Sequence, residues 1–511
     1  MRSRSKKAIA NISTSLLLQL VTIITGLIIP RLIISSFGSG VNGLISSINQ
    51  FLSFIVLFEA GVGGVTRAAL YKPLANKDIE SVSRITKAAE NFFRTVGLIF
   101  TGYLIVLSLL YPFIVKDGFN IIFTLSLVLI IGISTFVQYF FGITYQILLN
   151  ADQKQYFNSC LQIIAIVLNS IISVILIKVG APIHIVKLGS AIIYIAKPII
   201  LYIYVNRNYK IIRNIIPDDS AIKQKWDGFG HHISYLIRLH SDIIILTLFA
   251  NMREISVYSV YFMIINGIEQ LILTLSSGLE ATFGNILAKE ENESLKRNFS
   301  IFEFVSYSST TILYTCTAVL IIPFVKIYTH NITDVDYIRH LFAYLFIAGH
   351  ALYCIRMPYY CLVLAAGHYK QTKKIAIAEA MISVSVSVIL TYKFGIIGVA
   401  AGSLCAMLFG MTSYMIYLSN NILKKNFTSF LKRFCICIVN CVLILSLNKI
   451  LNLHYVGTYS NWVLNAFMIT IVAIFVTVGT GIIFYTEDIK NIINIFKTLI
   501  RNKIRKQPAD F

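Results

Sequence analysis

The sequence predicts an all-α membrane protein with about fourteen transmembrane helices, arranged as two six-helix repeats and a C-terminal hairpin. Three observations support this fold class: an apolar composition, a series of long hydrophobic segments and an internal repeat. Of the 511 residues, 57% are hydrophobic and 13% are charged, whereas soluble domains contain about 25% charged residues. So much apolar surface requires lipid as its solvent and excludes an ordinary soluble domain.

Fourteen hydrophobic segments are long enough to cross a membrane, because a bilayer core of about 30 Å needs roughly 20 helical residues. The first segment exceeds the roughly 7–15 apolar residues of a signal peptide and lacks a small-residue cleavage site, so we expect an uncleaved helix. The predicted spans are residues 9–31, 41–68, 92–113, 120–149, 156–177, 184–205, 229–250, 254–286, 299–324, 338–365, 374–392, 395–418, 431–450 and 460–485.

The basic residues predict how these spans are oriented. With a cytoplasmic N-terminus, 31 of the 44 Lys and Arg residues lie in or beside cytoplasmic segments, 9 lie outside and four lie within spans. Cytoplasmic loops are enriched in Lys and Arg. The asymmetry predicts a multi-pass protein of the bacterial cytoplasmic (inner) membrane with both termini in the cytoplasm. The same rule explains the net charge of +21. Since no basic stretch could form a domain, nucleic acid is not an expected partner.

The sequence carries no motif for catalysis, a cofactor or a metal. The eight cysteines fall within apolar runs without a C-x-x-C pair, and the nine histidines are scattered. H-E-x-x-H, P-loop, G-x-S-x-G and dinucleotide-binding patterns are missing from the sequence. We therefore expect a protein that is not an enzyme, with no catalytic residues, no cofactor and no metal site.

An internal repeat divides the chain near its middle. LANKDIESVSR at residues 74–84 matches LAKEENESLKR at residues 287–297 in five of eleven positions, and PFIVK, KQ and SVIL recur in the same order. Each half has six helices, so both halves enter the membrane in the same orientation, as in transporters with a site between parallel repeats. The predicted domains are a bundle at 1–205, a cytoplasmic linker at 206–228, a bundle at 229–418, and two extra helices with a basic tail at 419–511.

Four segments carry a resemblance to a known superfamily. They are FEAGVGGVTR at 58–67 with the following YKPLANKD, LLNADQK at 148–154, LAAGHYK at 364–370 and KFGIIGVAAGS at 393–403. With them the chain resembles the multidrug/oligosaccharidyl-lipid/polysaccharide exporter superfamily, and within it the bacterial O-antigen and polysaccharide flippases. The resemblance implies two bundles in a V around a central cavity.

The resemblance also implies a function. Such flippases move polyprenyl-diphosphate-linked glycans to the outer leaflet for surface polysaccharide export, by alternating access. The implied partners are the undecaprenyl-diphosphate-linked oligosaccharide, membrane lipid, a proton or sodium as coupling ion, and polysaccharide polymerase and chain-length proteins. Three alternatives stay open: a lipid II flippase, a multidrug or cation antiporter and, from a different class, a membrane-embedded polysaccharide polymerase or ligase. An enzyme of that class usually needs a large external loop, whereas the longest predicted outer loop here is short.

Four cations within spans are candidate substrate-binding residues, because burying a charge in a membrane is costly and guanidinium groups suit phosphate oxygens. Arg238 shares a helix face with Asp242 at i+4, so a structural ion pair is the alternative for both. Arg356 and Lys197 each lie close to a proline, and Lys197 and Arg67 could instead reach the interface. The candidates are Arg238, Arg356, Lys197 and Arg67.

Acidic and polar residues within spans are the remaining candidates. Glu59, Asp242 and Glu269 are predicted to bind a coupling proton or sodium. Ser15, Gln19 and Thr22 form a polar stripe at i, i+4 and i+7 on the first helix. The stripe is predicted either to line the sugar pathway or to form hydrogen bonds between helices.

Overall fold

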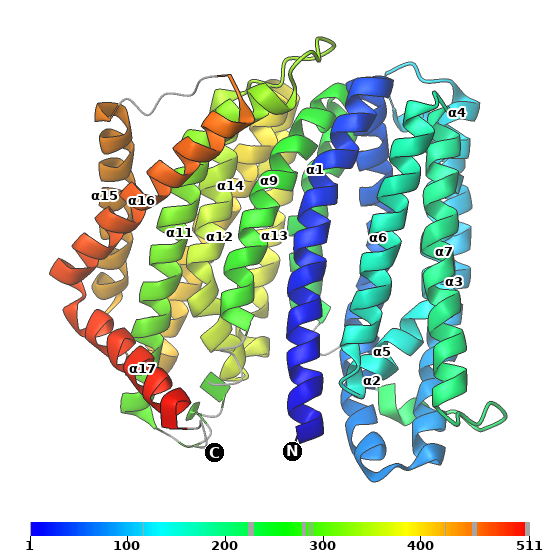
Figure 1. Ribbon diagram of the computed structural model, residues 1–511, viewed down its shortest axis with the longest axis horizontal. Coiled ribbons are helices and arrows are strands. Elements are labelled where there is room, and N and C mark those ends of the chain that lie inside the picture. The colour runs from blue at the N-terminus through cyan, green and yellow to red at the C-terminus, as the bar shows by residue number, and fades with distance from the viewer. Residues whose placement is uncertain are drawn as a thin grey trace, which may run out of the picture. The chain divides into compact units, whose positions relative to one another are not determined.

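The computed structural model describes residues 2–505 except 116, 223–228, 278–282, 285, 288, 290, 425 and 452–456. Within these residues every regular element is a helix (Figure 1). Contacts divide the chain into two compact units. Unit 1 comprises Met1–Met263 and Asn331–Asp336, and unit 2 comprises Ile264–His330 and Tyr337–Phe511. The all-α membrane fold class predicted from the sequence is confirmed.

Unit 1 contains long helices, two 3₁₀ turns (Ser53–Ile55 and Asp219–Ile222) and a π-helical turn (Gln138–Gly142). Its helices are α1 (Arg2–Leu52), α2 (Val56–Asn76), α3 (Ile79–Ile114), α4 (Ile121–Val137), α5 (Ile143–Ala151), α6 (Gln155–Lys178), α7 (Ile183–Asn208), α8 (Phe229–Phe249) and the first part of α9 (Met252–Ser277).

Unit 2 continues from α9 with a second set of long helices and a π-helical turn (Ser419–Leu423). Its helices are α11 (Asn292–Tyr328), α12 (His340–Ala365), α13 (Tyr369–Phe394), α14 (Ile396–Leu418), α15 (Phe427–Ile450), α16 (Tyr459–Phe484) and α17 (Thr486–Arg505).

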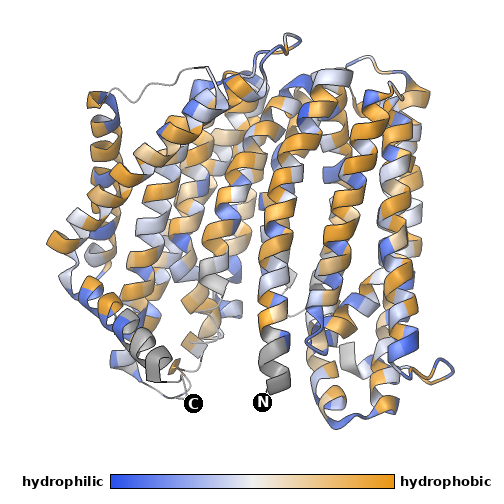
Figure 2. Cartoon of the chain, viewed as in Figure 1, coloured by the Kyte–Doolittle hydropathy of each residue, from blue (hydrophilic) through white to orange (hydrophobic). Residues whose placement is uncertain are grey.

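Twelve helical stretches of the described chain are long and apolar enough to cross a membrane. The first, Ile9–Ile55, contains the first predicted span and the start of the second, and α8 covers the predicted span 229–250. Each of the fourteen predicted spans therefore falls on a helix, although part of 254–286 lies outside the described residues. Figure 2 shows hydrophobic residues along most of the helix length. Phe113 and Phe475 are 75% and 80% exposed, as expected for side chains in contact with lipid.

Gly38 divides α1 into two helical segments. Its φ of 85° and ψ of 165° are conformations that glycine alone adopts readily. Directly after this break, the backbone N–H and the Oγ of Ser39 each donate a hydrogen bond of 2.7 Å to the Asp334 carboxylate. A carboxylate at a helix N-terminus satisfies free N–H groups and favours the positive end of the helix dipole. This contact explains why the short segment Asn331–Asp336 belongs to unit 1.

In unit 2, α13 and α14 form a tight hairpin around Gly395, whose φ is 52°. A Cβ atom at Gly398 or Gly402 would overlap the backbone of α13, and one at Gly410 would overlap the Glu379 carboxylate. Small side chains let helices in a membrane approach closely. The stripe on α14 that permits this packing has a small residue at every fourth position: Gly398, Gly402, Ala406 and Gly410.

The contact-based units differ from the predicted domains, because α8 and the first part of α9 lie in unit 1. Buried polar contacts hold them there. Asn42 donates to Ser256 Oγ at 2.8 Å, and the hydroxyls of Ser47 and Thr247 are 2.5 Å apart. A unit defined by contacts need not coincide with a repeat defined by sequence. The boundaries at 205, 229 and 418 therefore stay predictions.

Candidate functional site

In unit 1, α8 carries two of the predicted site residues. Asp242 is 3% exposed and accepts a hydrogen bond of 3.0 Å from Tyr258 Oη of α9. Arg238, one turn earlier, is half-buried, and its guanidinium carbon lies 5.6 Å from the centre of the Tyr235 ring. The same helix contributes His240, which is hydrogen-bonded to Gln50. The sequence pattern did not identify Tyr258 or Gln50 as partners, since both come from other helices.

The other two unit 1 cations have different surroundings. Lys197 is 7% exposed, and its Nζ donates to Gln162 Oε1 of α6 at 2.7 Å. Arg67 is exposed on α2. Lys197 is therefore buried between helices in the structure, whereas Arg67 is accessible at the surface of the protein. Substrate binding by either residue stays a prediction.

Unit 2 buries Arg356 in an ion pair with Glu379 of α13. The side chains are 8% and 9% exposed. The guanidinium carbon also lies 4.8, 5.4 and 5.5 Å from the ring centres of Tyr353, Tyr360 and Tyr414, close enough for cation–π attraction. Such an environment neutralises and desolvates the cation, so Arg356 is held by protein groups on three helices.

Glu269 forms a second buried contact of unit 2. One of its oxygens lies 2.5 Å from His350 Nδ1 of α12, and the glutamate is 0% exposed. The imidazole also packs edge-on against Phe346, with ring centres 4.6 Å apart. A carboxylate and an imidazole in contact can share or exchange a proton. The structure thus adds His350 to the candidate ion-coupling residue Glu269.

A third buried network of unit 2 links α11, α15 and α17. The Arg433 guanidinium lies 3.2 Å from Glu303 and 2.7 Å from Asp488. Tyr359 Oη of α12 donates to Glu303 at 2.5 Å. Sequence analysis missed these residues, although Glu303 and Glu379 both fall inside predicted spans. An acid within a span was the signal that could have identified them.

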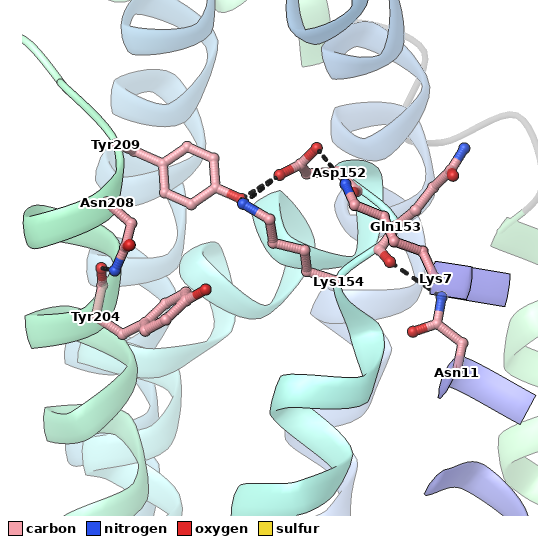
Figure 3. Close-up of polar contacts among 8 residues, drawn as sticks. All are labelled: Lys7, Asn11, Asp152, Gln153, Lys154, Tyr204, Asn208 and Tyr209. Atoms are coloured by element: carbon pink, nitrogen blue, oxygen red, sulfur yellow. Dashed lines mark hydrogen bonds and ion pairs between the residues drawn. The ribbon is translucent and has the colours of Figure 1, made fainter. Parts of the chain in front are cut away.

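Polar contacts also join three segments of unit 1 around Asp152, at the turn between α5 and α6 (Figure 3). We call Lys7, Asp152, Lys154 and Tyr209 the Asp152 cluster. Lys7 Nζ of α1 donates to the Asp152 carbonyl at 3.0 Å, while Tyr209 Oη and Lys154 Nζ lie 2.5 and 2.8 Å from the carboxylate. Burial opposes ionisation of Asp152, but the hydrogen bonds from Lys154 and Tyr209 lower its pKa below the usual value. The cluster thereby fastens α1 and the end of α7 to the α5–α6 turn.

The polar residues of α1 and Glu59 complete the predicted set. Ser15 and Gln19 of α1 are half-buried, and Thr22 is exposed. The backbone at Glu59 is helical in α2, but its side chain lies outside the described residues. The structure brings Arg238 and Asp242 together on α8. Lys197, Glu269 and Arg356 lie on three further helices, α7 in unit 1 and α9 and α12 in unit 2.

Comparison with solved structures decides the fold. A lipid II flippase MurJ in an inward closed conformation matches with a TM-score of 0.70 and 16% identity, covering 92% of this chain and 99% of that one. The chain has a MurJ/MATE-like transporter fold. A multidrug resistance MATE family transporter of the MOP superfamily matches this fold in its inward-facing form (TM-score 0.60, 14% identity, 81% and 98% covered). Its outward-facing form also matches (TM-score 0.58, 13% identity, 80% and 96% covered). No protein-family model and no curated protein sequence matches the chain.

Proposed function

We propose that this protein is a flippase that moves an undecaprenyl-diphosphate-linked oligosaccharide from the cytoplasmic to the outer leaflet by alternating access. The observation that carries the proposal is the extent of the likeness to the lipid II flippase. That likeness covers 92% of the chain, whereas the MATE transporters cover 80–83%. A fold that accommodates a lipid-linked cargo supports a lipid-linked substrate for this chain.

The proposed ligand for the diphosphate is Arg238. Its guanidinium is half-buried on α8, where reduced hydration strengthens charge-assisted hydrogen bonds to phosphate. Arg67 is exposed and would assist in capturing the head group. Lys197 and Arg356 would first have to leave Gln162 and Glu379, so their contribution would depend on a conformational change.

The proposed coupling residue is Glu269, acting with His350. Both lie in unit 2, and their contact at 2.5 Å inside the helix bundle allows a proton to be held between two titratable groups. Asp242, hydrogen-bonded to Tyr258, is a second candidate in unit 1. Binding of a proton or sodium would change the charge of these buried groups and so bias the alternating conformations.

The likeness to MATE transporters favours a multidrug or cation antiporter as the second candidate function, and the likeness to MurJ also supports flipping of lipid II. Deletion of the gene distinguishes the three. A glycan flippase mutant should accumulate undecaprenyl-diphosphate-linked oligosaccharide and lose surface polysaccharide. Accumulation of lipid II with cell lysis would favour lipid II, and drug sensitivity with normal glycan would favour the antiporter.

Reporter fusions test the membrane orientation on which this direction of transport rests. Fusions after Lys77, Lys223, Lys424 and Lys503 should report the cytoplasm, and fusions near Asp117 and His330 should report the exterior, because 31 basic residues lie on one side and 9 on the other. An exterior signal after Lys223 would contradict the six-plus-six arrangement, because the linker would then lie on the wrong side.

A further inference from the structure

Unit 1 contains a cavity of about 250 Å³ between α3, α5, α7 and the segment after α7. α5 packs against both α3 and α7, and the lining residues come from these three helices and from residues 211–213. Figure 1 labels the three helices in unit 1. Its lining residues include Thr86, Lys87, Glu90, Arg94, Tyr202 and Arg213. None of the candidate transport residues whose side chains are described in unit 1 lines it. The cavity is therefore separate from the proposed transport site.

The cavity lies at an end of the helices. α3 has 36 residues, which corresponds to roughly 54 Å of helix against a bilayer core of about 30 Å. Its apolar run begins after Asn91, so the turns that carry Thr86 and Glu90 extend beyond that core. The charge asymmetry of the sequence assigns this end to the cytoplasm.

Three cations and one acid give the cavity a net positive charge. Glu90 lies 3.7 Å from Lys87 and 2.7 Å from Arg94, so one carboxylate is shared by two cations. Arg213 donates to Tyr202 Oη at 2.5 Å, and its guanidinium carbon lies 5.2 Å from the centre of that ring. The side chain of Arg94 is 43% exposed, and Arg213 is exposed, so solutes can reach both cations.

The segment after α7 forms the fourth wall of the cavity, and contacts before and after Arg213 hold this segment in place. Tyr209 joins the Asp152 cluster shown in Figure 3, and the backbone N–H of Ile212 donates to Ser83 Oγ at 3.0 Å. Farther along, the Asp218 N–H donates to the Arg84 carbonyl at 3.2 Å. These contacts hold the segment that carries Arg213 against α3. The cavity is thus built by specific interactions rather than by a loose loop.

An unsatisfied group points to a ligand. Thr86 is 3% exposed, and its hydroxyl has no hydrogen-bond partner within the described part of the chain. The Nε of Arg94 is likewise buried without a partner there. A buried polar group without a hydrogen bond costs free energy, so native proteins usually satisfy it with protein, water or ligand. Both groups line the same cavity and can donate a hydrogen bond to an anion.

We propose that this cavity binds a phosphate ester of a polyol, presented either as a free metabolite or as the head group of a phospholipid. The forked donors of Arg94 and Arg213 and the hydroxyl of Thr86 match phosphate oxygens. Glu90 can accept hydrogen bonds from the hydroxyl groups of the polyol, which gives the ester contacts that inorganic phosphate cannot make. The volume of about 250 Å³ lies just below the range of about 300–1,000 Å³ for drug-sized ligands and fits such a molecule.

Binding of glycerol 3-phosphate tests the proposal. The purified full-length protein is placed in phosphatidylcholine nanodiscs and titrated by calorimetry, with inorganic phosphate and glycerol as comparison solutes. We expect saturable binding of glycerol 3-phosphate, weaker binding of phosphate and none of glycerol. Arg213→Ala and Thr86→Val should each weaken binding, the arginine change by roughly tenfold or more because a charge-assisted hydrogen bond is lost. Arg207→Ala is the matched control, since Arg207 is an exposed cation near the end of α7 that does not line the cavity.

A second experiment distinguishes a phospholipid head group from a free metabolite as the source of the phosphate ester. The protein is placed in nanodiscs that contain phosphatidylglycerol, and co-purifying lipid is measured after washing, for wild type and Arg213→Ala. Retention of phosphatidylglycerol that is lost in Arg213→Ala but not in Arg207→Ala identifies a lipid head group. Binding of glycerol 3-phosphate without such retention identifies a free metabolite. If wild type binds neither probe, or if Arg213→Ala and Thr86→Val bind like wild type, the proposal is overturned.

Discussion

Among the described residues, the ion pair that joins α1 to the α5–α6 turn in unit 1 is partly exposed, whereas the ion pairs that join different helices of unit 2 are buried. In unit 1, the side chains of Lys7 and Asp152 are 30% and 26% exposed. In unit 2, those of Arg356 and Glu379 are 8% and 9% exposed. An exposed ion pair contributes about 0–1 kcal/mol, while breaking a buried one costs about 3–5 kcal/mol. The two units therefore use charged residues for different purposes. In unit 2, buried ion pairs hold helices together. In unit 1, an ion pair fastens a turn, and Arg238 is half-buried.

From this difference between the two units we expect the largest mutational effect on export at Arg238. Arg238→Ala should abolish polysaccharide export while the protein stays folded, because the proposed transport site loses the cation that would replace the water of the diphosphate. Arg238→Lys should restore part of the export, since the charge survives and the fork geometry does not. Surface glycan and thermal stability in detergent are measured on both variants.

The double variant Arg238→Ala/Asp242→Ala separates the cargo role from a structural pair. We expect folding to be retained without export. Near-normal export in the double variant would assign Arg238 to helix packing and move the search for the diphosphate site to Lys197 and Arg356.

The next largest effect is expected at Arg356. Arg356→Ala should lower stability by about 3–5 kcal/mol, because Glu379 is left as a buried charge without its partner. Arg356→Met/Glu379→Leu should recover much of that loss and restore export. The measurement is thermal unfolding in detergent, with Arg67→Ala as the exposed-cation control. A recovered fold without export would show that Arg356 also contacts the cargo, which would contradict a purely structural role for the buried ion pairs of unit 2.

A smaller effect is expected at the attachment of α17. Asp488→Asn removes a charge 2.7 Å from Arg433, and Glu303 still neutralises the guanidinium. We expect a loss of about 1–3 kcal/mol, the range for a hydrogen bond to a charged group. Limited proteolysis after Phe484 should become faster than in Glu487→Gln, the neighbouring control. Equal proteolysis rates would mean that the buried network does not hold this helix.

The smallest effect is expected at Asp152. Its pKa is lower in the folded protein than in the unfolded chain, so its ionised form stabilises the fold. That contribution is present above the unfolded pKa, about 3.9, and is lost as the pH falls through the lower folded value. Asp152→Asn should cost up to about 1 kcal/mol at pH 7, and this cost should shrink as the pH is lowered through the folded pKa. Melting temperatures of both proteins across this range provide the measurement, and a constant difference would contradict the assignment.

The sequence predicted the helices better than the partners of their charged residues. Hydrophobic length alone located every span, because lipid imposes the same length on each helix. The partners Glu379, His350 and Gln162 come from other helices than the residues they contact, and helical periodicity describes one helix at a time. The break at Gly38 falls between the predicted spans 9–31 and 41–68, but the sequence did not single out this glycine, since glycine is common in membrane helices. Within α8, by contrast, the i, i+4 spacing correctly placed Arg238 and Asp242 on one helix face.

The buried pair of α12 and α13 has a consequence for how the protein is made. α12 is the least hydrophobic of the twelve candidate spans and carries Arg356, a residue that costs about 2.5–3.5 kcal/mol during membrane insertion. Its counter-charge, Glu379, leaves the ribosome 23 residues later, and α14 provides the glycine that makes room for the pair. We expect α12 to remain at the insertion machinery until α13 emerges, so that the helices enter lipid together. Truncated nascent chains that end after α12 should be poorly integrated, and chains that end after α14 should be stable in the membrane.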